Sequence, residues 1–271
     1  FGLFGFPRME IEGAALGGVI ANILTMFASM FFVMYREQLV NIRALDLHLI
    51  MDSWRRILHV GLPSLTSSLV SPVTTAFITH QIATFGQESV AGFGIASRIE
   101  GLSLMAMMAL SAGMTPFVGQ NFGAQRLDRV REGIRFAYRF SLFYGLAIGA
   151  FLLLFGGFVV DLFGLQGAAR DTALLQMHVV PISYIALGCA MTVNGSLNAL
   201  GKPVAAMWIS MSRTIAVYAP LAWLLSQFFG LVGIFIAAAS ANAIAGGIGV
   251  LWLGLVYREA VADKPLRTRP A

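Results

Sequence analysis

Seven long apolar segments alternate with shorter polar stretches along this chain. A helix needs about 20 mostly apolar residues to cross a bilayer, and each segment is long enough to do so. The segments cover residues 11–34, 59–85, 90–122, 140–160, 172–200, 204–228 and 231–257. The pattern predicts an all-α fold, a polytopic membrane helix bundle with seven transmembrane helices.

The polar stretches divide the chain into four parts. Residues 1–35 hold the first span, residues 59–257 hold the other six spans as one bundle, and residues 258–271 form a polar tail. In residues 36–58, apolar side chains recur at helical spacing with charged side chains between them. That spacing predicts a cytoplasmic amphipathic linker helix on the inner membrane surface, although an ordinary solvated linker is an alternative.

Composition and charge support a membrane protein. The chain is 58% hydrophobic and 11% charged, whereas soluble domains carry roughly 25% charged residues. The formal net charge of +5 does not indicate nucleic-acid binding, because the basic residues lie in loops between apolar runs. One alternating set of loops holds 14 of the 18 Lys and Arg residues, which places the C-terminus in the cytoplasm. These residues are Arg36, Arg43, Arg55, Arg56, Arg126, Arg129, Arg131, Arg135, Arg139, Lys202, Arg258, Lys264, Arg267 and Arg269.

The first and last spans resemble one another. Gly13 and Asn22 have the same separation as Gly233 and Asn242, and both spans end in Tyr-Arg-Glu. If this marks a repeat, the first span closes one half of a longer protein and the other six spans form its second half. Duplicated halves are typical of transporters, although two apolar helices can also match by chance.

A stripe of hydroxyl side chains follows the second span at helical spacing. The spacing places all five on one face, and Pro72 removes a backbone hydrogen bond near the middle of the same helix. Such a stripe either lines a substrate cavity, which we favour, or mediates helix packing. The cavity candidates are Ser64, Ser67, Ser68, Ser71 and Thr75, with Met105 and Met108 of the third span as flexible apolar candidates.

Three charged side chains fall inside predicted spans: Arg98, Glu100 and Arg213. Charges at that depth are costly and usually face the bundle interior and pair with one another. Because Glu100 and Arg213 match in depth, we expect an ion pair between them, with Arg98 as the other possible partner. The alternatives are an unpaired Glu100, which is a candidate for proton coupling, and a third helix that starts later, which leaves Arg98 and Glu100 solvated.

The sequence gives no indication of catalysis. No spacing of His, Cys or carboxylates predicts a metal site, no nucleophile–base–acid arrangement is present, and no phosphate-binding loop occurs. The single Cys189 lies in an apolar run, which excludes a disulfide framework. We therefore expect neither an enzyme nor a resident metal or cofactor.

Four short motifs resemble the multidrug and toxic compound extrusion (MATE) transporters. They are GLP at residues 61–63, VGQNFGA at 118–124 before a basic segment, LGKP at 200–203 and the entry PRMEIEGAA at 7–15. The resemblance implies that the chain consists of the last helix of the N-terminal lobe and the six-helix C-terminal lobe of a twelve-helix transporter. The chain, which begins with Phe1, is therefore expected to be the C-terminal portion of something longer.

The resemblance also implies a function. A protein of this kind is expected to be a secondary active antiporter for multidrug efflux that is monomeric at full length. Such an antiporter exports organic, often cationic, drugs or metabolites across the inner (plasma) membrane in exchange for H⁺ or Na⁺. Its expected partners are the lipid bilayer and small organic substrates. Residues 59–85 and 172–200 carry no acid in their membrane part, so the chain looks like the DinF-like branch, whose coupling site lies in the missing N-terminal lobe. A lipid-linked sugar flippase and an inactive one-lobe fragment are the alternatives.

Overall fold

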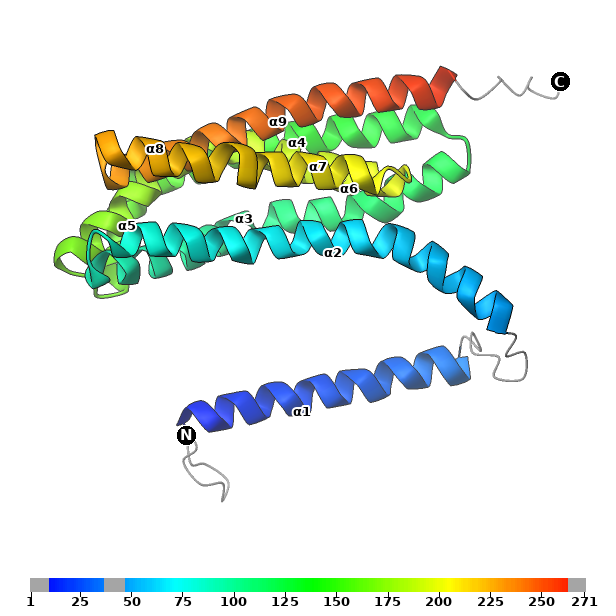
Figure 1. Cartoon of the computed structure of the whole chain (residues 1–271), viewed down its shortest axis with the longest axis horizontal. Coiled ribbons are helices and arrows are strands. Elements are labelled where there is room, and N and C mark those ends of the chain that lie inside the picture. The colour runs from blue at the N-terminus through cyan, green and yellow to red at the C-terminus, as the bar shows by residue number, and fades with distance from the viewer. Residues whose placement is uncertain (1–9, 37–46, 263–271) are drawn as a thin grey trace. The chain divides into compact units, whose positions relative to one another are not determined.

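The structure is a computed structural model that describes residues 10–36 and 47–262, and these residues are helical almost throughout (Figure 1). The chain divides into two compact units, Phe1–Ile57 and Leu58–Ala271, which are described separately. The first unit contains α1 (Glu10–Phe31), which ends in the π-helical turn η1 (Phe32–Arg36). In this turn the Arg36 guanidinium lies 5.7 Å from the centre of the Phe32 ring.

The helix α2 (Leu47–Ala83) begins in the first unit and continues into the second. The expected linker helix therefore has no separate end at residue 58, and its first part, residues 37–46, lies outside the described residues. The helix continues because the apolar positions before residue 58 keep the same helical period as the span that follows.

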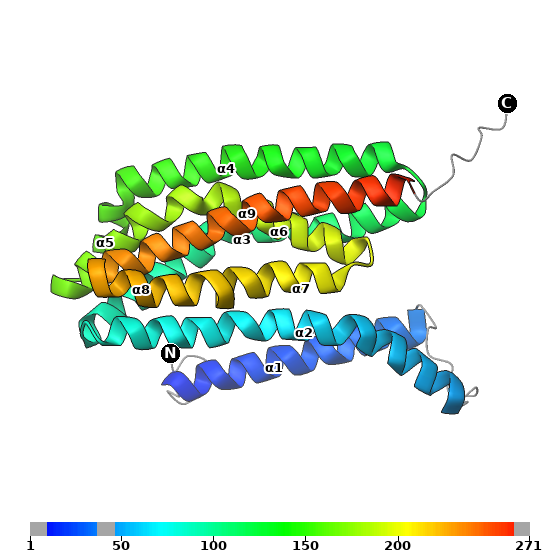
Figure 2. The ribbon, with the colours of Figure 1, turned by 45° about the horizontal axis from the view of Figure 1, so that its top comes forward.

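The second unit is a bundle of antiparallel helices (Figures 1 and 2). Short turns join consecutive helices, and two helices are interrupted by irregular segments. After α2 the order is α3 (Gln87–Gly123), α4 (Leu127–Leu162), α5 (Gly167–Val179), the 3₁₀ turn η2 (Val180–Ser183), α6 (Tyr184–Ala199), α7 (Pro203–Met211), the π-helical turn η3 (Ser212–Tyr218), α8 (Ala219–Phe229) and α9 (Leu231–Ala262).

The structure confirms the all-α membrane fold. Among the described residues, six helical stretches are long and apolar enough to cross a membrane: Ala15–Arg36, Gln87–Gly123, Leu127–Leu162, Gly167–Ala199, Pro203–Phe229 and Leu231–Glu259. The remaining expected span, residues 59–85, falls almost wholly within α2, and its many Ser and Thr residues make it less apolar than the others.

The basic segment after α3 is helical rather than a loop. The loop expected up to residue 139 ends much earlier, because α4 begins at Leu127. Val130 and Ala137 are fully buried and pack in one cluster with Val118 of α3. Because this apolar face continues the face of the span, the helix extends beyond the purely apolar run while the arginines stay exposed.

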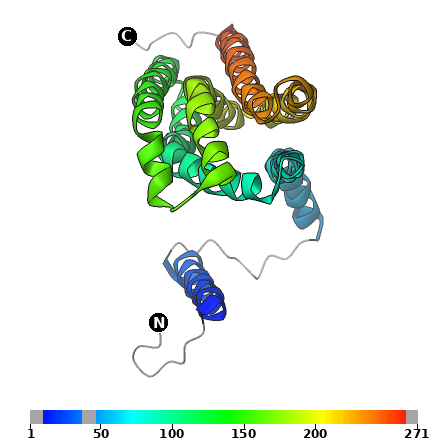
Figure 3. The same cartoon turned by 90° about the vertical axis from the view of Figure 1, so that its left-hand side faces the viewer.

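The helix α6 packs against α3, α4 and α9 (Figures 2 and 3). Small and hydroxyl residues allow α3 and α6 to approach closely, as is common between membrane helices. The Ser111 hydroxyl of α3 donates a hydrogen bond to the carbonyl of Met191 at 2.7 Å. A Cβ atom on Gly195 of α6 would lie 2.8 Å from the Ser111 carbonyl oxygen, so only glycine fits at this crossing.

Candidate functional site

A cavity of about 310 Å³ lies inside the second unit, between α2, α3, α5, η3 and α9. Its wall combines apolar side chains with several polar and charged ones. Polar residues inside a membrane protein are costly and usually mark a functional pathway. The polar side chains in the wall include Thr75, Glu100, Gln176, Arg213, Tyr218 and Asn242.

Glu100 of α3 is held by an amide of α5. The Gln176 Nε2 atom donates a hydrogen bond to Glu100 Oε2 at 2.8 Å. Gln176 is 2% exposed, and its Oε1 atom has no hydrogen-bond partner among the described residues. A buried acceptor without a partner is rare because leaving it unpaired costs free energy. Glu100 therefore lines the cavity next to a buried amide whose oxygen acceptor has no partner among the described residues.

Arg213 belongs to a second hydrogen-bond chain. Its Nη1 atom donates to Asn242 Oδ1 at 2.9 Å, and the Asn242 Nδ2 atom donates to the Ser183 hydroxyl at 3.0 Å. The Ser183 hydroxyl in turn donates to the carbonyl of Val180 at 2.8 Å. This chain joins η3, α9 and η2.

Prolines in the sequence explain why the helices are interrupted by the irregular turns η2 and η3 at this cavity. Proline has no N–H to donate, so Pro181 and Pro220 each leave the carbonyl four residues earlier without its usual donor. The backbone adopts the 3₁₀ turn η2 around Pro181 and the π turn η3 just before Pro220. π turns often occur at functional sites, and interrupted helices form the substrate sites of many transporters.

The expected ion pair between Glu100 and Arg213 is not formed. Both side chains line the cavity, but no oxygen of Glu100 lies within 4.0 Å of an Arg213 nitrogen. Arg98 is exposed and does not line the cavity. The prediction was wrong because neutral amides on α5 and α9 reach both charged groups, and depth in the membrane alone does not reveal such partners.

Only some of the apolar and hydroxyl candidates from the sequence line this cavity. Met108 and Thr75 line the cavity, whereas Met105 is 60% exposed and does not. The side chains of Ser64, Ser67, Ser68 and Ser71 lie outside the described part of the structure, so the cavity-lining role of this stripe stays a prediction.

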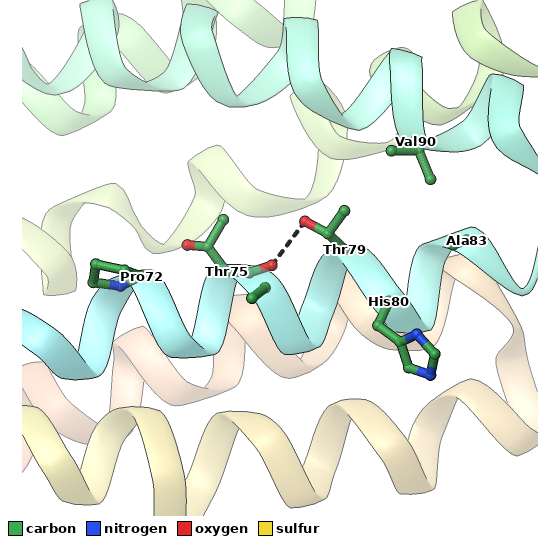
Figure 4. A pocket seen from close by; sticks show the side chains of 7 residues that line it. Pro72, Thr75, Thr79, His80, Ala83 and Val90 are labelled. Carbon is green, nitrogen blue, oxygen red and sulfur yellow. Dashed lines mark hydrogen bonds between the residues drawn. The ribbon is translucent and has the colours of Figure 1, made fainter.

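Thr75 also borders an open groove of about 790 Å³ along α2 (Figure 4). The Thr79 hydroxyl donates to the carbonyl of Thr75 at 2.7 Å, and Val90 of α3 also lines the groove, opposite the stretch of α2 between Thr79 and Ala83. His80 extends from another side of α2 in the same view. The hydroxyl stripe thus continues one turn beyond the residues chosen from the sequence.

Sequence reasoning missed Gln176, Ser183, Tyr218 and Asn242. A signal exists, because an amide inside an otherwise apolar span is uncommon and needs a partner. In the sequence, Asn242 stands out only as part of the pattern that the first and last spans share. What the sequence does not reveal is that Gln176, Tyr218 and Asn242, which lie on different helices, line one cavity, and that Ser183 is hydrogen-bonded to Asn242.

The MatE family model matches residues 61–224, which is more than half of the chain. The chain belongs to the MATE family of transporters. It is therefore an integral membrane protein, and the members of its family are transporters rather than enzymes.

Relatives and solved structures agree with this assignment. The FAD transporter of Shewanella oneidensis is 27% identical over 246 residues, which cover 91% of this chain and 54% of the relative. The probable multidrug resistance protein NorM of Thermotoga maritima is 26% identical over 244 residues, covering 87% of this chain and 51% of the relative. A mutant of the Vibrio cholerae MATE transporter VcmN superposes with a TM-score of 0.83 and 31% identity, covering 95% of this chain and 57% of that one. The chain spans about half the length of the relatives it matches.

Replacing Asn242 with alanine is expected to destabilise this MATE bundle by about 1–3 kcal/mol, because two interhelical hydrogen bonds are lost and Arg213 is left unpartnered. The apparent unfolding temperature of the purified protein measures the effect. Asn198→Ala is the matched control, since Asn198 is exposed near the end of α6. Equal unfolding temperatures for the two variants would show that the hydrogen-bond chain is not structural.

Proposed function

We propose that the protein containing this chain is a secondary active antiporter that exports small organic compounds in exchange for H⁺ or Na⁺. In this proposal the chain supplies the C-terminal lobe and the last helix of the N-terminal lobe. The observation that carries the proposal is the polar cavity, which lies where η2 and η3 interrupt the helices of a MATE family chain. We expect the coupling-ion site in the other lobe.

The orientation forms part of the proposal. The α3–α4 turn together with the first half of α4, the α6–α7 turn and the end of α9 carry most of the described basic residues of this bundle, whereas Arg170 is a basic residue near the opposite end. Because cytoplasmic loops retain Lys and Arg, this distribution supports a cytoplasmic C-terminus in the inner (plasma) membrane.

The cavity can hold a ligand through charges of both signs. Glu100 and Arg213 line it without pairing with one another, so each can face an oppositely charged group of a substrate. An organic cation, as expected for multidrug export, fits beside the Glu100 carboxylate and the neighbouring Gln176 Oε1 atom. An unsatisfied acceptor next to a carboxylate favours a ligand that carries hydrogen-bond donors.

A second candidate substrate class is a flavin nucleotide. It is supported by Arg213 in the cavity and by the similarity to a protein named as an FAD transporter. Arginine binds phosphate groups with two parallel hydrogen bonds, which suits a dinucleotide.

Transport by the full-length protein in proteoliposomes tests the proposal. With an imposed H⁺ or Na⁺ gradient, we expect export of an organic cation dye that stops when the gradient is collapsed. Arg213→Gln is expected to leave cation export within about twofold but to abolish any FAD export, since only the phosphates need the guanidinium. Absence of gradient-driven movement of either compound, with the protein correctly folded, would refute antiport of these substrates.

A further inference from the structure

A separate cavity of about 430 Å³ lies between the first turns of α4 and the last turns of α9. It is at the opposite end of α9 from the α8–α9 turn and shares no lining residue with the polar cavity. Ile134 of α4 and Val250 and Leu253 of α9 form its apolar wall. Leu253 is 2% exposed and packs on α6, so the wall is continuous with the core of the bundle.

Two arginines, Arg131 and Arg258, lie at the edge of this cavity, which is called the apolar slot below. Arg131 projects from α4 and Arg258 from α9, and both side chains are exposed. Within the part of the chain that the structure describes, neither guanidinium has a hydrogen bond or an ion pair. The carboxylates of Asp128, Glu132 and Glu259 on the same helices do not line the cavity.

Two tyrosines also line this cavity. The Tyr257 hydroxyl donates to the carbonyl of Leu127 at 2.7 Å, which joins the end of α9 to the start of α4. The Tyr138 hydroxyl is buried and has no hydrogen-bond partner among the described residues. A buried hydroxyl without a partner is costly, so a ligand that accepts a hydrogen bond at this point would recover that free energy.

We propose that this cavity binds one anionic phospholipid. The lipid phosphate lies between Arg131 and Arg258, an ester oxygen accepts a hydrogen bond from Tyr138, and one acyl chain follows the wall formed by Val250 and Leu253. Basic pockets between transmembrane helices bind anionic head groups, and guanidinium groups match phosphate geometry. The apolar wall on a membrane-spanning helix selects a lipid over a soluble phosphate compound. A bound lipid would link α4 and α9, which otherwise meet chiefly through α6.

Native mass spectrometry of the purified full-length protein tests the proposal. The probes are phosphatidylglycerol, phosphatidylethanolamine and inorganic phosphate. We expect a single phosphatidylglycerol adduct that survives excess inorganic phosphate, and a loss of that adduct on the order of tenfold in the double variant Arg131→Gln, Arg258→Gln. The matched control is Arg129→Gln, Arg135→Gln, which removes the same charge from exposed positions of α4 that do not line the cavity.

A second variant keeps both arginines, so any loss of the lipid adduct in it cannot result from an effect of the charge change on folding. Gly254 lines the cavity, and a Cβ atom added there meets nothing within 4 Å, so we expect Gly254→Phe to place its ring in the cavity and expel the acyl chain while the protein still folds. Equal adduct loss in the arginine control would show a general surface-charge effect. Full adduct retention in the double variant or in Gly254→Phe, or displacement by inorganic phosphate, would overturn the lipid assignment.

Discussion

Gly92→Ala is expected to reduce the yield of folded protein about tenfold. Gly92 is buried where α3 packs against α5, and an added Cβ atom would overlap the backbone carbonyl of Ala169. Overpacking a core typically costs about 1–3 kcal/mol, and a clash with backbone cannot be relieved by a side-chain rotation. Such a loss is a large fraction of a typical folding free energy of about 5–15 kcal/mol. Fluorescence-detected size-exclusion chromatography measures the monodisperse yield.

The matched control for this prediction lies two residues further along the same helix. Gly94 is exposed, and a Cβ atom there meets nothing within 4 Å. Gly94→Ala removes the same backbone freedom and adds the same methyl group, so its yield should equal or exceed that of the parent. If both variants fold equally well, α3 and α5 are not packed as closely as the structure shows.

Glu100→Gln is expected to raise the KM for an organic cation on the order of tenfold while the folded yield changes less than twofold. The glutamine keeps an oxygen that can accept the hydrogen bond of Gln176, so packing is preserved, but the negative charge at the cavity is lost. Dye-export rates in proteoliposomes, measured over a range of substrate concentration and pH, give KM and the pH dependence together.

Two comparisons make the Glu100 result interpretable. Glu88→Gln removes an exposed carboxylate near the start of α3 and should leave KM unchanged. If the coupling site lies in the other lobe, the pH dependence of export should also persist in Glu100→Gln. An unchanged KM with loss of the pH dependence would contradict the substrate-binding role and assign Glu100 to ion coupling. A collapse in folded yield would instead show that Glu100 is structural.

Most of the elements were predictable because a membrane imposes strong local rules. Every backbone group in the lipid must be satisfied within its own helix, so long apolar runs can only be helices. Boundaries were less predictable where an amphipathic helix continues a span: α4 begins before its apolar run, and α2 has no break at residue 58. In both places the helical period of the apolar positions, rather than the start of the purely apolar run, indicates how far the helix extends.

The candidate site was predictable only in part. Thr75 and Met108, which the sequence analysis gave as cavity candidates, line the polar cavity together with Glu100 and Arg213, and a role of these residues in substrate binding stays a prediction. Met105 does not reach the cavity, because its side chain lies on an exposed face of α3. The partners of Glu100 and Arg213 were predicted incorrectly, because two groups at the same depth in a bilayer need not be neighbours.

The membrane class, the all-α fold and the family follow from the sequence alone, because apolar run length and short motifs are local properties of the chain. Which polar groups meet becomes known only once the helices are packed. Gln176 of α5 is hydrogen-bonded to Glu100, and Asn242 of α9 is hydrogen-bonded to Arg213. Likewise, Arg131 and Arg258 flank one apolar slot although they lie far apart along the chain. Such pairings depend on the rotation of each helix about its axis, and that rotation is set by the packing of whole helix faces rather than by any single segment.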